Sequence, residues 1–97
     1  MTALAKRAVH LTHLSLFQLF RLTDAGVREL AVNLSALEQL DLHGCMALTR
    51  RTVQHLLAPD AKLRSLRSLD LAGCRNIPRD DIDRLKAART ELDVISF

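Results

Sequence analysis

One pattern of leucines recurs along this chain and constrains its fold more than any other feature. The pattern L-x-x-L-x-L starts at Leu11, at Leu37 and at Leu66, and a weaker copy occupies Leu92–Phe97. Successive copies begin 26, 29 and 26 residues apart. A period of this length indicates a stack of similar units, because each unit can bury its apolar face only against its neighbours.

Each period is typical of a short strand, a turn and a helix. In the second copy, Leu40 and Leu42 alternate with polar residues, as in a strand that buries one face. Thr49 is a favourable helix N-cap residue, and Pro59 predicts the end of the helix that follows. The inner face of this helix is predicted to consist of Val53, Leu56 and Leu57.

The flanking copies repeat this plan with two changes near the helix start. Thr23 and Asp24 begin the first helix, and Asp24 suits the positive end of the helix dipole. Pro78 stands where the threonines stand and has no side chain that could cap the helix, so we expect it to be an early helical residue. The pattern predicts an α/β fold with parallel strands on one face and helices on the other.

We expect a single domain over residues 1–97, with repeats at 11–36, 37–65 and 66–91 and a closing strand at 92–97. Residues 1–9 are predicted to be either the tail of a preceding repeat or a capping helix. In the first case we expect the chain to be a fragment, a short isoform or a gene-model product of a longer protein.

The composition argues against several classes of function. Hydrophobic residues make up 48% of the chain but aromatic residues only 3%, so the core must be aliphatic. The 14 basic and 11 acidic residues are interspersed, and Trp and Tyr are absent. This pattern argues against a nucleic-acid binder, which combines a basic stripe with stacking aromatics. No apolar run approaches the ~20 residues needed to span a bilayer, which argues against a membrane protein.

Two cysteines are too few for a disulfide framework and favour a reducing compartment. We therefore expect a cytoplasmic protein, and a nuclear location is equally compatible with this argument. The N-terminus lacks a secretory signal. A mitochondrial location is disfavoured because the repeat pattern already begins at residue 11.

Cys45 and Cys74 occupy the same place in adjacent copies, and we expect small buried thiols in the turn after each strand. Stacked equivalents could approach disulfide distance, and a catalytic thiol would need an oriented base that no pattern here specifies. The four histidines lack cysteine or carboxylate partners at zinc-ligand spacing; they are His10, His13, His43 and His55. We therefore expect no metal, no cofactor and no catalytic activity.

Leu40–Cys45 reads LDLHGC, Leu69–Cys74 reads LDLAGC, and Leu22–Leu30 reads LTDAGVREL. These segments carry a pattern similar to that of the cysteine-containing leucine-rich repeat family. Over about residues 10–97 the chain resembles the repeat region of F-box/leucine-rich-repeat proteins, and it is also similar to the antagonist-of-mitotic-exit-network family. The resemblance implies a leucine-rich-repeat solenoid with strands on its concave face and helices on its convex face. The chain departs from the pattern at Leu19, which replaces a cysteine, and at Pro78.

The resemblance also implies a function. It indicates a protein–protein interaction module that is the substrate-recognition region of an F-box-type ubiquitin ligase receptor in an SCF complex. No stretch long enough for an F-box lies outside the repeats, so a Skp-type adaptor would bind only through an F-box that this chain lacks. The alternative is a leucine-rich-repeat scaffold, assembly factor or inhibitor without a link to a ligase.

Side chains between the inward leucines are predicted to face solvent on the concave side. These are His13, Ser15, Gln39, Asp41, Ser68, Asp70, Val94 and Ser96, and Phe17, His43 and Ala72 follow the strands. Asp41 and Asp70 would repel each other at ~5 Å, the spacing of neighbouring strands, unless solvated or met by a cation. They form either a docking strip for a basic segment or a solvated pair. Phe17 is either a contact anchor or a cover for the open end.

The candidate protein-binding residues are therefore His13, Ser15, Phe17, Gln39, Asp41, His43, Ser68 and Asp70.

Overall fold

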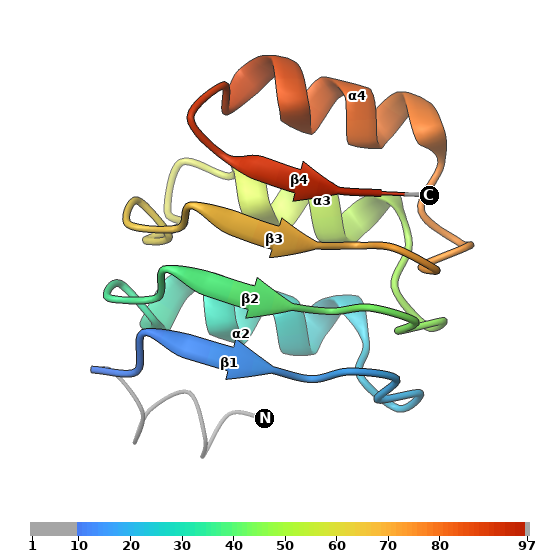
Figure 1. Cartoon of the computed structure of the whole chain (residues 1–97), viewed down its shortest axis with the longest axis horizontal. Coiled ribbons are helices and arrows are strands. Elements are labelled where there is room, and N and C mark those ends of the chain that lie inside the picture. The colour runs from blue at the N-terminus through green and yellow to red at the C-terminus, as the bar shows by residue number, and fades with distance from the viewer. Residues whose placement is uncertain (1–9, 97) are drawn as a thin grey trace.

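The computed structural model describes residues 10–96, in which strands and helices alternate (Figure 1). With the labels of Figure 1, the order is β1 (His13–Ser15), α2 (Asp24–Asn33), β2 (Gln39–Asp41), α3 (Arg50–Leu57), β3 (Ser68–Asp70), α4 (Arg79–Ala88) and β4 (Asp93–Ile95). The strands form one parallel sheet in the order β1-β2-β3-β4. The α/β class with parallel strands is therefore confirmed. The expectations for residues 1–9 and for Phe97 lie outside the described residues.

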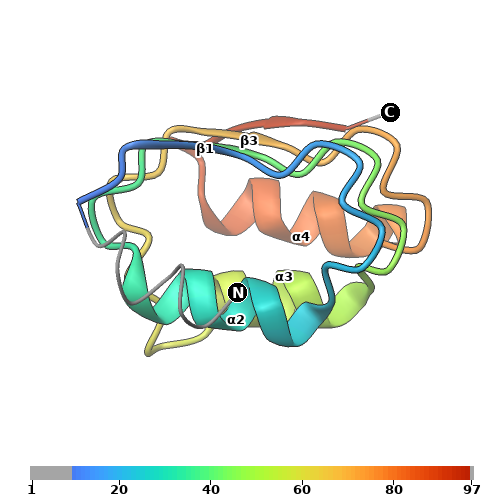
Figure 2. The ribbon, with the colours of Figure 1, turned by 90° about the horizontal axis from the view of Figure 1, so that it is seen from below.

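The helices lie on one side of the sheet and leave its other face open (Figure 2). Helix α2 packs against α3, and α3 packs against α4. Each connection from a strand through a helix to the next strand therefore returns the chain to the neighbouring position in the same sheet, as parallel strands require.

The core is a column of aliphatic side chains between the sheet and the helices. Leu14 is aligned with Leu40, Leu40 with Leu69, and Leu69 with Val94. The largest side chains that are fully buried are all leucines among the described residues. Burying one leucine contributes about 1.5–3 kcal/mol, so the repeated leucine positions provide most of the driving force for stacking.

The last strand differs from its sequence-based prediction. Val94 was expected on the open face, but it is 9% exposed and lies opposite Leu69. The reason is that the segment between Leu92 and β4 is one residue shorter than the segment between Leu66 and β3. Arg67 and Ser68 both donate their N–H groups to Glu38 O, whereas only Asp93 N donates to Arg67 O. The missing residue shifts the strand by one position, and a one-residue shift moves every side chain to the opposite face.

The same shift corrects the prediction for Ser96. Its hydroxyl accepts a hydrogen bond from Lys86 Nζ of α4 at 3.0 Å, so this side chain is directed towards the helix rather than the open face. Asp93 and Ile95 take the open-face positions that Val94 and Ser96 were predicted to hold.

The turn after each strand requires a left-handed residue. Gly44 and Gly73 have φ values of 72° and 75°, and Gln18 occupies the equivalent place in the first unit with φ 53°. Glycine adopts this conformation without steric cost, whereas a residue with a Cβ does not. Gln18 is the only non-glycine residue with positive φ in the described part of the chain, so the first turn is the most strained of the three.

The three helices begin close to where the sequence predicts, but their first turns are held differently. Thr49 Oγ1 accepts a hydrogen bond from Arg51 N at 3.3 Å, which confirms Thr49 as an N-cap. Thr23 makes no such hydrogen bond. Pro78 has φ −61° and ψ 145° and therefore precedes α4 instead of forming its first turn.

A carboxylate at the start of α2 holds the start of α3. Asp24 accepts hydrogen bonds from Thr49 N at 2.9 Å and from the hydroxyls of Thr49 and Thr52, both at 2.6 Å. Burial alone would raise the pKa of Asp24, but the hydrogen bonds from Thr49 and Thr52 outweigh it and hold the pKa below its usual value. Asp24 thus stays ionised at neutral pH and satisfies N–H and O–H donors of the next unit.

An equivalent contact joins α3 to α4. Arg50 is the first residue of α3, and its Nε lies 4.0 Å from Oδ2 of Asp81, the third residue of α4. Asp24 and Thr52 hold the same two positions in α2 and α3. A polar contact therefore joins the first residue of α2 to the third residue of α3, and a longer one of 4.0 Å joins the first residue of α3 to the third residue of α4.

We expect Leu69→Ala to lower the free energy of unfolding by about 2–5 kcal/mol, since it leaves a cavity in the middle of the leucine column. Leu69 is fully buried. Urea denaturation followed by circular dichroism measures the loss. Leu14→Ala is the matched control, because Leu14 is only partly buried in β1 and should cost less. Equal losses for the two variants would contradict the stacked arrangement.

Candidate functional site

The open face of the sheet brings six of the predicted binding residues together. Two rows of aligned side chains cross the strands: one is His13, Gln39, Ser68 and Asp93, and the other is Ser15, Asp41, Asp70 and Ile95. A hollow of about 450 Å³ lies over this face, and all six predicted strand residues line it. Their placement agrees with the sequence analysis, and their role in binding stays a prediction.

Besides the leucines Leu14 and Leu40, this hollow is lined by an apolar residue that sequence reasoning did not place on the open face. Ile95 lines it beside the polar side chains, because β4 is shifted by one position relative to the leucine pattern. Ile95 ends the row that contains Asp41 and Asp70. The face therefore combines carboxylates and hydroxyls with an apolar side chain at one edge.

The two aspartates at the ends of β2 and β3 are held by the backbone. Asp41 Oδ1 accepts a hydrogen bond from His43 N at 2.9 Å, and Asp70 Oδ1 accepts one from Ala72 N at 2.9 Å. Ser15 Oγ donates a further hydrogen bond to Asp41 Oδ2 at 3.2 Å. An aspartate that binds the N–H two residues later is a common way to start a turn. Each carboxylate thus has a structural task in addition to any contact with a partner.

A line of side chains follows the carboxyl ends of the first three strands. The Phe17 ring stacks on the His43 ring with centroids 5.0 Å apart and an interplanar angle of 23°. His43 Nδ1 lies 3.8 Å from Asp70 Oδ1. Ala72, which was predicted to be exposed beside these residues, is buried. Phe17 and His43 therefore form one surface with Asp70, and Ala72 does not contribute to it.

The segment after β1 carries the exposed large hydrophobic side chains of the described residues. Phe17 is 54% exposed, Leu19 39% and Phe20 63%. Phe17 partly covers His43 and leaves more than half of its own surface free. The ring therefore covers part of His43 and leaves an aromatic surface that a partner can contact, and its role as a cover for the N-terminal end stays a prediction.

Both cysteines are small buried side chains in the turns after β2 and β3, as predicted. Cys45 Sγ donates a hydrogen bond to Leu16 O at 3.1 Å, and Cys74 Sγ donates one to Leu42 O at 3.0 Å. Burial raises the pKa of Cys45, and it raises the pKa of Cys74 to about 11. Both thiols are free and protonated at neutral pH. Each one ties its turn to the preceding unit, and neither is prepared to act as a nucleophile.

Residues 10–96 contain no group of three or more His, Cys, Asp or Glu side chains that could hold a metal ion. Within the same residues, no helix is long and apolar enough to cross a membrane.

A scan of known protein-family models gave no match to the sequence, and a search of curated proteins gave none either.

We expect Asp70→Ala to destabilise the fold by about 1–3 kcal/mol, because the N–H of the buried Ala72 loses its acceptor. Asp70→Asn retains an amide oxygen that can accept the same hydrogen bond, so it should cost less. Urea unfolding of both variants measures the difference. If Asp70→Asn lowered the free energy of unfolding as much as Asp70→Ala, the charge of Asp70, rather than its hydrogen bond to Ala72 N, would be the stabilising factor.

We expect both cysteines to react slowly with iodoacetamide at neutral pH in the folded chain and rapidly after unfolding in urea. Burial keeps the thiols protonated, and the thiolate is the reactive form. Mass spectrometry of the alkylated protein counts the modified thiols over time. Rapid modification of Cys74 in the folded chain would contradict the raised pKa.

Proposed function

We propose that the chain is a short leucine-rich-repeat solenoid that binds another protein through the open face of its sheet and has no catalytic activity. The observation that carries this proposal is the hollow on the open face. Polar side chains from β1, β2 and β3 line it. No described helix covers that side of the sheet (Figure 2).

The repeat interpretation is supported by features that recur from unit to unit. The leucines of successive patterns are paired in register in the sheet. The turns repeat a left-handed residue at Gln18, Gly44 and Gly73. The cysteines repeat the same hydrogen bond to the preceding unit. A solenoid is built from such equivalent contacts between nearest neighbours.

The interpretation as a binding face is supported by the chemistry of its side chains. Gln39 is exposed, and Asp41 and Asp70 each have one oxygen that does not take part in the turn hydrogen bond. Phe17 offers an exposed aromatic ring at the margin of these polar groups. An aromatic contact beside polar groups is the usual composition of a protein-binding surface.

The resemblance to F-box/leucine-rich-repeat proteins leads to a more specific proposal. In it, the open face recognises the substrate of a ubiquitin ligase, and a Skp-type adaptor binds through an F-box that is not in this sequence. The alternative proposal is a scaffold, assembly factor or inhibitor that acts through the same face without a ligase. The buried thiols fit a reducing compartment in either case, the cytoplasm or the nucleus.

We expect a photo-crosslinking residue at position 39 to capture a partner that the same residue at position 54 does not. Gln39 lies on the open face, and Gln54 is an exposed glutamine on α3, so the two sites are chemically matched. Irradiation in cells followed by mass spectrometry identifies the adducts. Adducts that include ligase substrates would favour the first proposal, and stable assembly partners would favour the second.

The Asp41→Asn/Asp70→Asn variant provides the control, because it removes both charges and can keep the turn hydrogen bonds. Loss of the adduct in this folded variant would show that the partner contacts the carboxylates. Equal adducts from positions 39 and 54 would contradict binding by the open face.

A further inference from the structure

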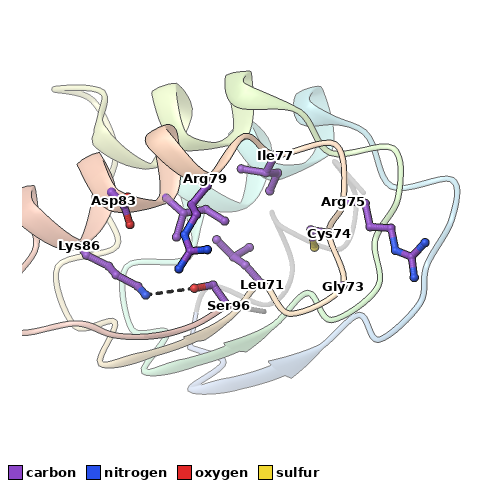
Figure 3. A pocket seen from close by; sticks show the side chains of 10 residues that line it. Leu71, Gly73, Cys74, Arg75, Ile77, Arg79, Asp83, Lys86 and Ser96 are labelled. Carbon is purple, nitrogen blue, oxygen red and sulfur yellow. Dashed lines mark hydrogen bonds between the residues drawn. The ribbon is translucent and has the colours of Figure 1, made fainter.

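A second hollow lies away from the open face of the sheet, beside α4. It has a volume of about 330 Å³ and lies between α4, the turn after β3 and the residue that follows β4 (Figure 3). Its apolar lining includes Leu71, Ile77 and Ile82, which belong to the buried core. None of the candidate binding residues on the open face lines it.

The charged side chains around this hollow are mostly basic. Arg79 and Lys86 project from α4, and Arg75 projects from the turn after β3 with its guanidinium directed away from the other two (Figure 3). Asp83 is the acidic residue among its lining side chains. Within residues 10–96, no carboxylate oxygen lies within 4.0 Å of a charged nitrogen of these three basic residues. Basic residues therefore outnumber acidic ones by three to one among the described charged residues that line the hollow.

The contacts between helices show which position of a following helix lies near the first residue of the helix before it. The first residue of α2, Asp24, contacts Thr52 of α3, and the first residue of α3, Arg50, contacts Asp81 of α4. Arg79 is the first residue of α4 and the next member of this series. No described helix packs on the far side of α4.

The contact of Arg50 shows which chemical groups are complementary to an arginine at the start of a helix. Asp81 supplies a carboxylate, and Ile82, which follows it, is an aliphatic side chain at the edge of the core. A segment with the same chemistry would place its carboxylate near Arg79 and its aliphatic side chain over the hollow. The excess of basic side chains in the described lining favours the carboxylate, and a volume of about 330 Å³ admits the aliphatic group.

We propose that this hollow, which is lined by Arg75, Arg79 and Lys86 and has an apolar floor, docks an acidic, leucine-rich segment of a partner protein. The carboxylates of the segment pair with Arg79 and its neighbours, and an aliphatic side chain enters the hollow. This surface is separate from the open face, so a partner can occupy both at the same time.

The test uses two peptides that carry fluorescein on the N-terminus, Glu-Asp-Leu-Glu-Glu-Leu-amide and its counterpart with lysine at every acidic position. Fluorescence anisotropy of the peptides with the full chain should show binding of the acidic peptide only. NMR of the isotope-labelled chain should place the largest methyl shifts at Ile77 and Ile82. Arg79→Glu should weaken binding about tenfold, because it replaces an attraction by a repulsion.

Arg51→Glu is the matched control, since Arg51 is an exposed arginine in the first turn of α3 that does not line the hollow. It changes the net charge equally and should leave binding unchanged. Circular dichroism checks that both variants are folded.

Failure of the acidic peptide to bind would overturn the proposal, as would equal binding of the lysine peptide or equal loss in Arg51→Glu. Shifts at Ile77 and Ile82 that depend on protein concentration without peptide would also overturn it. They would show that a second copy of the chain occupies the hollow.

Discussion

The structure depends on one constraint: each unit is too thin to cover its own leucines. A strand of three residues and one helix leave the apolar side chains open at both edges of a unit, and only an equivalent unit presents a matching surface. The parallel register of Leu14, Leu40 and Leu69 is the result. Because the leucines must align, the residues beside them align as well, and the open face acquires its rows of equivalent side chains.

The alignment of equivalent positions also determines which hydrogen-bond partners the buried polar groups find. Contacts from one unit to the next connect equivalent positions: Cys45 bonds to Leu16 O and Cys74 to Leu42 O. No buried side-chain nitrogen or oxygen lacks a hydrogen-bond partner in the part of the chain that the structure describes. Unpaired polar groups in a narrow aliphatic core would cost more than the small interface between two units could offset. The buried thiols and hydroxyls are therefore part of the stacking contact.

Much of the fold follows from the leucine period, because a residue that recurs at the same place must meet the same neighbours. This argument predicted the parallel strands, the buried cysteines and the six open-face residues of β1, β2 and β3. It was wrong for Val94 because the leucine pattern does not reveal the length of the entry into β4. Leu92 is separated from the strand by one residue fewer than Leu66 is. The side chains of β4 therefore point to the opposite faces of the sheet, although Leu92–Phe97 still resembles the leucine pattern.

Sequence reasoning also could not find the contacts of Asp24. Its partners Thr49 and Thr52 lie one repeat away, and they reach it because α2 packs against α3. The roles of Asp41 and Asp70 in their turns could have been predicted, because an aspartate two residues before a turn N–H is a local signal. Hydrogen bonds of a side chain within a turn can thus be inferred from the sequence, whereas hydrogen bonds between helices require the packed structure.

The parallel sheet also fixes the spacing of the contacts available to a partner that lies across its open face. Neighbouring strands are separated by about 4.8 Å, so equivalent side chains recur at this interval in each row. In an extended chain the side chains of one face recur every two residues, about 6.6 Å apart, so they are out of step with the rows at the first neighbouring strand. One turn of an α-helix advances by about 5.4 Å and stays close to the strand interval. Of these two conformations, only the helix keeps one side chain close to each strand along its length.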